Sequence, residues 1–259
     1  MKIDICLVTS NENPAYYVFY PYIKEIWEKL LNVKCILVYI GDTLPTILEG
    51  YEESIIMFKP ITGIHTAFIA QTIRLLYPCI MNEYKNGILI SDVDAIPLNG
   101  PYFTNQIEKY ADDTFISYSF DPKVDATKEQ NMSYNVALSK VWRDIFKVSN
   151  IDDINRTLIQ WYQEVKEYHF DTKYRSKCKG FHFDQQVFYK SLENWPLRKT
   201  HLISFDLSKR SRLHKITASN EKEVLEKIRE GKYDDFIFLR PYQKHLSSKL
   251  KIKSLILSK

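Results

Sequence analysis

The segment Gly87-Ile88-Leu89-Ile90-Ser91-Asp92-Val93-Asp94-Ala95-Ile96-Pro97-Leu98 is an apolar run that ends in two aspartates spaced one residue apart. Consecutive apolar residues are typical of a strand covered on both faces, and Pro97 limits how far regular pairing can continue. The aspartates therefore follow the strand's carboxyl end, where open α/β sheets bind ligands. Neighbouring carboxylates suit Mg²⁺ or Mn²⁺, and a metal held there could bind a diphosphate.

An Asp-x-Asp triplet alone is weak evidence, because about one is expected by chance in a chain of this composition. Its plain alternative is a solvated turn after a strand. The uncharged strand before the triplet and the proline after it favour a functional site.

The composition describes an ordinary globular protein that can bury a substantial core. Of its 259 residues, 45% are hydrophobic and 26% are charged. We expect one α/β domain, residues 1–215, with a central and mostly parallel sheet flanked by helices. A basic C-terminal extension, residues 216–259, is expected to pack on the same domain.

The formal net charge is +4, and Lys and Arg outnumber acids strongly from Lys209 onward. This asymmetry indicates an anionic partner, either a diphosphate or an anionic membrane surface. Lysines alternate with Leu and Ile from Lys244 to Lys259, so this tail could touch a bilayer peripherally or pack on its own domain. Nucleic acid is not expected, because zinc-finger spacing and an aromatic-basic RNA-binding signature are both missing.

The four cysteines are far apart and form no Cys-x-x-Cys pair, which argues against a zinc knuckle or a disulfide framework. We therefore expect reduced thiols in a cytoplasmic protein. No stretch approaches the roughly eighteen apolar residues of a membrane span.

Strand and helix patterns alternate before the acidic segment and predict a β-α-β unit. Thr9 follows the first predicted strand, 3–8, and suits a loop over a nucleotide. Asp42 follows the second, 33–40, and could meet a ribose or a base, or be a turn aspartate after glycine. The predicted helices here are 16–31 and 63–77, and a third strand is predicted at 54–58.

The helix 63–77 carries Gln71 and Arg74, whose spacing of three residues places them on a shared face. Arg74 could pair with Asp92 or a phosphate, or it could be a solvated helix residue. Beyond the aspartates, the patterns predict helices at 105–110, 151–169, 181–192 and 221–231, and strands at 114–119, 133–138 and 202–207.

Two later residues are candidates for chemistry. Asp184 begins a helix, where its oxygens could cap the N-terminus or act as a general base. His214 lies in the basic stretch 209–215, which could neutralise a leaving diphosphate. This histidine could add a nitrogen ligand to the metal, although isolated histidines are more often ordinary surface or core residues.

These features, taken in chain order, resemble a nucleotide-sugar-dependent glycosyltransferase of the GT-A fold. The resemblance covers about residues 1–215. It is carried by the β-α-β unit, Gln71 with Arg74, Asp92-Val93-Asp94, Tyr134-Asn135, Asp184-Gln185 and Arg212-Leu213-His214.

The resemblance implies roles for individual residues. Asp92, Asp94 and His214 would bind Mn²⁺ or Mg²⁺, with Asp92 also near the ribose or a metal-bound water. Asp184 would be the base of an inverting reaction. The nucleotide sugar would be bound by residues from several elements: Thr9, Asp42, Gln71, Arg74, Asp92 and Asn135.

The implied activity moves a sugar from a UDP- or GDP-sugar, with UDP-sugar favoured, to a hydroxyl on a glycan, protein or lipid. One alternative is a haloacid-dehalogenase-like phosphatase, whose nucleophile motif also follows an apolar strand, but Ala95-Ile96-Pro97 lacks the usual Thr. Another is a non-catalytic nucleotide-sugar or glycan-binding protein on a degenerate transferase fold.

Overall fold

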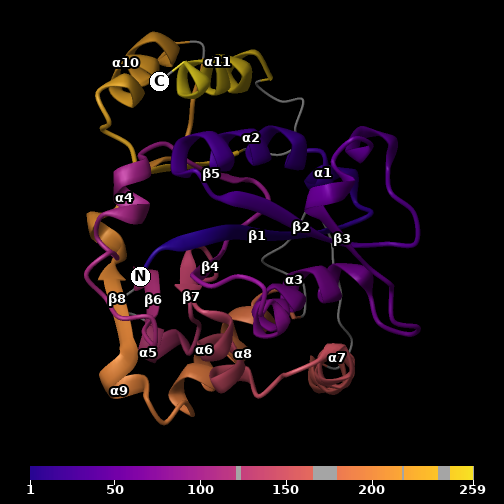
Figure 1. The fold of residues 1–259 in the computed structure, drawn as a ribbon. Coiled ribbons are helices and arrows are strands. Elements are labelled where there is room, and N and C mark those ends of the chain that lie inside the picture. Colours follow the sequence, from indigo (N-terminus) through magenta and orange to yellow (C-terminus); the bar gives the residue numbers. More distant parts are fainter. Residues whose placement is uncertain (121–123, 166–179, 218, 239–245, 259) are drawn as a thin grey trace.

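A seven-stranded sheet forms the centre of the protein, and helices cover both of its faces (Figure 1). The computed structural model describes residues 1–120, 124–165, 180–217, 219–238 and 246–258. This architecture confirms the predicted α/β class with its mostly parallel central sheet.

The strands of the large sheet lie close to the ranges that the sequence predicts. The strands are β1 (Ile3–Asn11), β2 (Lys34–Ile40), β3 (Ile55–Phe58), β4 (Gly87–Ile90), β5 (Ala95–Pro97), β6 (Phe115–Phe120), β7 (Asn135–Ala137), β8 (Leu202–Asp206), β9 (Arg212–Leu213) and β10 (Asp235–Ile237). The first strand runs on through Thr9, which was expected in a loop, and β5 and β9 have no predicted counterpart. The helices are α1 (Pro14–Tyr17), α2 (Tyr20–Leu31), α3 (Thr66–Leu76), α4 (Gly100–Thr104), α5 (Val124–Thr127), α6 (Ser139–Phe146), α7 (Ile151–Val165), α8 (Phe183–Glu193), α9 (Arg198–His201), α10 (Glu221–Arg229) and α11 (Leu246–Leu257).

The order of strands in the large sheet is β3-β2-β1-β4-β7-β6-β8. β1 pairs in parallel with β2 and β4, whereas β7 runs antiparallel to its neighbours β4 and β6. The chain thus builds outward from β1 through β2 and β3, and then places β4 on the opposite side of β1. This reversal between β1 and β4 is a topological switch point, where open α/β sheets bind ligands.

A hydrophobic cluster lies on each face of the sheet. In β1, Cys6 and Val8 belong to one cluster and Ile5 and Leu7 to the other, because alternate side chains of a strand point to opposite faces. The first cluster includes residues of α2, α4, α10 and α11, and the second includes residues of α3, α6, α7 and α8. The central strands are therefore buried on both sides, as the apolar run before Asp92 predicts.

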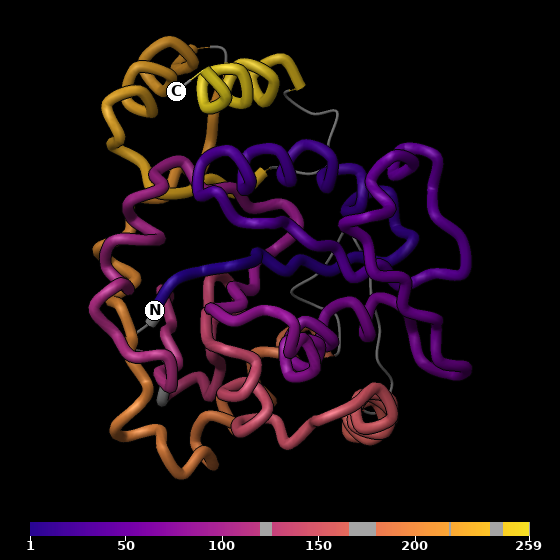
Figure 2. The backbone as a smooth tube through the Cα atoms, viewed as in Figure 1, coloured from indigo at the N-terminus to yellow at the C-terminus, as the bar shows by residue number. Residues whose placement is uncertain are grey.

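The C-terminal segment packs on the rest of the protein (Figure 2). α11 lies against α2 and α10, and an ion pair of 2.6 Å joins Lys253 to Glu25 of α2. The C-terminal strand β10 also lies between β5 and β9 in a second, three-stranded sheet of order β5-β10-β9. The structure thus shows the packing alternative for residues 246–257 and lends no support to membrane contact. Among the described residues, no helix is long and apolar enough to cross a membrane. The division at residue 215 stays a prediction.

Two predicted helices differ from those observed. The helix predicted at 105–110 was wrong, because α4 lies earlier, at Gly100–Thr104, and turns follow it. Pro101 stands in the first turn of α4, where a missing backbone N–H leaves no helical bond unmade. The predicted helix 151–169 is observed at Ile151–Val165, and its last four residues lie outside the described ranges.

Candidate functional site

A cavity of about 340 Å³ opens at the switch point between β1 and β4. Its lining combines residues 9–11 at the end of β1, residues 92–94 after β4, and α3 side chains that include Gln71 and Arg74. Residues 131–133 before β7 and Asp184 of α8 complete much of the wall. The fold therefore gathers most of the predicted site residues around one cavity.

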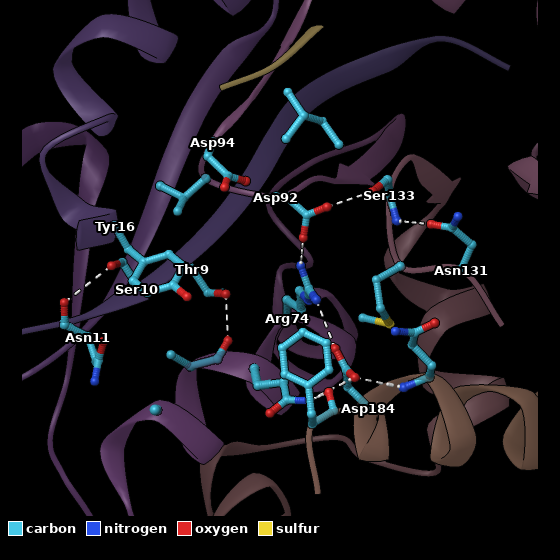
Figure 3. A pocket seen from close by; sticks show the side chains of 18 residues that line it. Thr9, Ser10, Asn11, Tyr16, Arg74, Asp92, Asp94, Asn131, Ser133 and Asp184 are labelled. Carbon is cyan, nitrogen blue, oxygen red and sulfur yellow. Dashed lines mark hydrogen bonds and ion pairs between the residues drawn. The ribbon is translucent and has the colours of Figure 1, made fainter. Parts of the chain in front are cut away.

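Arg74 links two aspartates that are far apart in the sequence (Figure 3). Its guanidinium donates one hydrogen bond to Asp92 Oδ1 and another, of 2.8 Å, to Asp184 Oδ2. The Arg74 side chain is 12% exposed and that of Asp184 is 3% exposed. The predicted pairing of Arg74 with Asp92 is thus observed, and Asp184 is a further partner.

Asp184 is held on both of its carboxylate oxygens. Oδ1 accepts hydrogen bonds from Gln71 Nε2 and from the Gln185 backbone N–H, each of 2.9 Å. Burial raises the pKa of Asp184 above its usual value, although the charge and hydrogen bond of Arg74 act in the opposite direction. A raised carboxylate pKa is a property that favours proton transfer from a substrate hydroxyl.

Asp92 has a different environment. Burial alone would raise its pKa, but the charge of Arg74 and the hydrogen bond from Ser133 outweigh that effect and lower it. Ser133 Oγ donates to Asp92 Oδ2 over 2.5 Å. Asp92 is therefore ionised and oriented from two sides.

Ser133 reaches Asp92 because β7 is antiparallel to β4. Asn135 in β7 pairs with Ile90 at the end of β4, so the residues just before β7 lie at the carboxyl edge of β4. Tyr134 N–H donates to Ile90 O over 3.1 Å and fixes this approach. The loop before β7 and the loop after β4 therefore meet at this edge of the sheet.

Asp94 also lines the cavity and is 5% exposed. Its backbone carbonyl accepts a hydrogen bond of 2.8 Å from Phe238 N–H, which ties it to the end of β10. Lys249 of α11 lies within its electrostatic reach. Burial lowers the pKa of Lys249 to about 8, against the smaller opposing effect of the Asp94 charge.

The described parts of the chain contain no group of three or more His, Cys, Asp or Glu side chains that could hold a metal ion. A metal that the substrate helps to bind needs fewer ligands from the protein. Mg²⁺ is commonly held by one or two carboxylates together with substrate phosphates. Asp94 fits that donor set, and Asp92 could join it directly or through a water.

The end of β1 supplies the opposite wall of the cavity. Thr9 Oγ1 donates a hydrogen bond of 2.6 Å to the Ala70 carbonyl and so joins β1 to α3. Asn11 Nδ2 donates to Thr66 Oγ1 over 3.0 Å. Figure 3 places Thr9, Asn11 and Tyr16 together, across from Ser133 and Asn131.

Three predicted site residues are placed away from the cavity. Asp42 and His214 are exposed and are not part of its lining. Asn135 is fully buried, and its side-chain amide donates to the carbonyls of Asn131 and Met132 over 3.0 and 3.1 Å. These positions lend no support to the predicted roles of Asp42 in nucleoside binding, His214 in metal binding or Asn135 in sugar contact.

Sequence reasoning did not select several residues that line the cavity. Among them are Ser133, Asn131, Tyr16, Phe181 and Gln185. Gln185 stands beside Asp184, and Asn131 Oδ1 accepts a hydrogen bond of 2.9 Å from Ser133 N–H. The available signal was their place at element ends: Tyr16, Ser133 and Phe181 begin predicted elements and Asn131 lies just before one, and residues at such ends often carry ligand contacts.

No protein-family model matches the chain, and no curated protein matches it significantly. Solved structures are similar to it. The chain aligns with the apo form of the glycosyltransferase GlyE from Streptococcus pneumoniae TIGR4 over 100% of its own length and 63% of that protein, at 11% identity and a TM-score of 0.48. It thus spans less than two thirds of that protein.

Two further structures are similar over nearly all of both chains. Apo mouse xyloside xylosyltransferase 1 aligns with 93% of this chain and 99% of its own, at 9% identity and a TM-score of 0.41. A glycosyltransferase involved in glycosylation of the major capsid of PBCV-1 aligns with 98% of each chain, at 10% identity and a TM-score of 0.43.

Proposed function

We propose that this protein transfers a sugar from a nucleotide-diphosphate sugar to a hydroxyl acceptor. The observation that supports this best is the position of three carboxylates, two of which pair with Arg74. Asp92, Asp94 and Asp184 surround one cavity at the β1/β4 switch point, where open α/β sheets bind nucleotides.

The chain's own residues suit the two ends of such a donor. Residues 9–11 and Tyr16 offer a polar and aromatic wall for the nucleoside. Asp184 offers a buried carboxylate for the sugar end, and a carboxylate oxygen has two lone pairs. Oδ2 of Asp184 accepts one hydrogen bond from Arg74, which leaves a lone pair for a substrate hydroxyl.

In the transfer, the bond between the sugar's anomeric carbon and the diphosphate oxygen breaks, and a bond from that carbon to the acceptor oxygen forms. The electron pair leaves with the diphosphate, and the acceptor's proton passes to Asp184 as general base. A bound Mn²⁺ or Mg²⁺, held by Asp94, would stabilise the charge that develops on the diphosphate. Arg74 keeps Asp92 and Asp184 in place while this happens.

The phosphatase alternative requires a carboxylate that is free to attack phosphorus. Both oxygens of Asp92 accept hydrogen bonds, from Arg74 and Ser133. Because each of these oxygens keeps a second lone pair, the assay with phosphomonoesters described below is what separates the phosphatase from the transferase.

The first test is thermal unfolding with UDP or GDP, with and without MnCl₂ or MgCl₂. We expect the nucleotide to raise the melting temperature only with the divalent cation, and Asp94→Asn to remove the shift. Asp152→Asn, on the exposed start of α7, is the matched control and should keep it. A full shift in Asp94→Asn would overturn the metal assignment.

The second test measures hydrolysis or transfer with a panel of UDP- and GDP-sugars. Loss of a general base commonly costs about 10²- to 10⁴-fold in rate, so Asp184→Asn should lose at least about 100-fold while still binding UDP. Binding of donors with no turnover by the wild type would instead support the non-catalytic binding protein. Release of phosphate from simple phosphomonoesters would revive the phosphatase.

A further inference from the structure

We propose that Arg210 and Ser133 are positioning residues that hold Asp92 through a buried chain of hydrogen bonds. The proposal extends the proposed function, because Asp92 belongs to the cavity assigned to the donor. It also gives a role to the basic stretch 209–215, which the sequence suggested as a neutraliser of diphosphate.

The chain of hydrogen bonds runs from Arg210, just before β9, to the cavity. Arg210 donates to Ser119 Oγ over 2.7 Å, and Ser119 Oγ donates to the Ser133 carbonyl over 2.8 Å. Ser133 Oγ then donates to Asp92 Oδ2 over 2.5 Å. The Arg210 side chain is 1% exposed, and Ser119 and Ser133 are buried. Buried and connected hydrogen bonds of this kind fix side-chain orientation.

Tyr134, directly after Ser133, has a strained backbone. Its φ is +64°, a conformation that bulky non-glycine residues rarely adopt and that concentrates at functional sites. Packing holds it there: its ring lies edge-on to Phe103, with ring centroids 4.9 Å apart, and is fully buried. The Arg210 guanidinium lies 5.2 Å from the Tyr134 ring centroid. Arg210 thus contacts the ring of the strained residue directly and supports the Ser133 carbonyl through Ser119.

Arg210 is itself kept in place by charge. Asp235 of β10 is fully buried and accepts two hydrogen bonds from Arg212, of 2.9 and 2.7 Å. Arg210 Nε lies 3.8 Å from the other oxygen of Asp235. Two guanidinium groups therefore share one carboxylate, and the excess positive charge lies beside the face of Tyr134, where the ring attracts a cation.

Asp92 is consequently oriented from two directions, by Arg74 of α3 and by Ser133 before β7. Without Ser133, the carboxylate would lose one of these donors and could rotate about its side chain. Arg74 would then lose a fixed partner, and the cavity would lose its preorganised shape. We expect the loss to appear as weaker nucleotide binding.

The test compares Ser133→Ala, Arg210→Lys and Arg210→Met with the wild type by titration calorimetry, using UDP and GDP in the presence of MnCl₂. Hydrogen bonds to charged groups are worth enough to change affinity by about tenfold or more. We expect Ser133→Ala and Arg210→Met each to weaken binding by about tenfold. Ser139→Ala is the matched control, since Ser139 is a buried, hydrogen-bonded serine away from the cavity, and it should bind as the wild type does.

The double variant Ser133→Ala/Arg210→Met separates positioning from general loss of structure. If Arg210 acts through Ser133, the double variant binds no more weakly than Ser133→Ala alone, because coupled residues are not additive. Losses that simply multiply would overturn the proposal. Arg210→Lys, which keeps the charge beside Tyr134, should recover part of the affinity.

Hydrogen exchange measured without any nucleotide provides an independent arm. Ser133→Ala and Arg210→Met should speed exchange in peptides covering 88–98 and 128–137, and Ser139→Ala should not. Unchanged exchange in the first two variants would overturn the proposal. If the wild type binds neither UDP nor GDP, the proposed function fails, and this exchange arm still decides whether Arg210 and Ser133 hold Asp92.

Discussion

Arg74→Met should be strongly destabilising, because it removes the cation from between two buried carboxylates. Asp184 has a side chain only 3% exposed and would lose its sole ion pair among the described residues. Asp92, 29% exposed, would keep its hydrogen bond from Ser133 and some contact with water. Breaking a buried pair by removing one partner costs about 3–5 kcal/mol, and we expect about 4 kcal/mol here, mostly from Asp184.

The assay is urea unfolding followed by circular dichroism, supported by the melting temperature. For a chain of this size, about 4 kcal/mol corresponds to a melting temperature lower by about 8–16 °C. The matched control is Arg156→Met, which removes a cation that is 76% exposed and pairs with Asp153 along one helix. Such surface pairs contribute about 0–1 kcal/mol, so this variant should unfold almost as the wild type does.

A compensating variant tests the stated cause. In Arg74→Met/Asp184→Asn the most deeply buried unpaired charge is gone, so we expect about half of the lost stability to return. The deficit of Arg74→Met should also shrink as the pH falls from 7 to 5. Without Arg74, burial raises the pKa of Asp184 further above its unfolded value, so the folded state binds a proton that the unfolded state does not. A loss under about 1 kcal/mol, or no rescue by Asp184→Asn, would refute this reasoning.

Three further predictions concern other buried groups. Tyr134→Phe should leave stability unchanged or raise it by up to about 1 kcal/mol, because the buried Tyr134 hydroxyl has no hydrogen-bond partner among the described residues; urea unfolding checks this, and a loss above 1 kcal/mol would contradict it. Burial lowers the pKa of Lys249 to about 8 in the folded protein, from 10.5. As the pH rises from 8 toward 10.5, Lys249 therefore loses its proton in the folded protein but keeps it in the unfolded chain, and the cost of burying its charge disappears. The stability of the wild type relative to Lys249→Met should therefore improve over that interval, and a flat difference would count against it. Gln71→Leu, which removes a hydrogen bond to Asp184 Oδ1, should slow turnover by about tenfold with a smaller change in UDP affinity, and weaker UDP binding with unchanged turnover would show that Gln71 acts on binding alone.

The sequence was informative wherever the position of a residue followed from the pattern of its own helix or strand. The apolar run before Asp92 required a strand buried on both faces, and the two hydrophobic clusters meet that requirement. The spacing of Gln71 and Arg74 required a shared helix face, and both residues reach Asp184 from it. These inferences needed only one element and its neighbour in the chain.

The sequence could not locate a residue relative to the cavity where that location depended on the direction of a strand or on its distance from the switch point. Ser133 could be found only by knowing that β7 runs antiparallel to β4. Asp42 follows β2, which β1 separates from β4, so its side chain starts one strand away from the cavity. His214 follows the short strand β9, in which Leu213 points inward, and alternation turns the next side chain outward.

The charge of the cavity gives a further reason to expect a cation with the donor. Its lining contains one guanidinium, Arg74, against the carboxylates of Asp92, Asp94 and Asp184, a formal charge of −2 when all are ionised. A nucleotide diphosphate would add more negative charge to a space of about 340 Å³, where repulsion between like charges is stronger than in water. Lys249 interacts electrostatically with Asp94 and offsets only part of this charge, since burial favours its neutral form. If the donor is a nucleotide diphosphate, as we propose, we expect a cation to bind with it, and Asp94, which lines the cavity, is the residue that we expect to hold that cation.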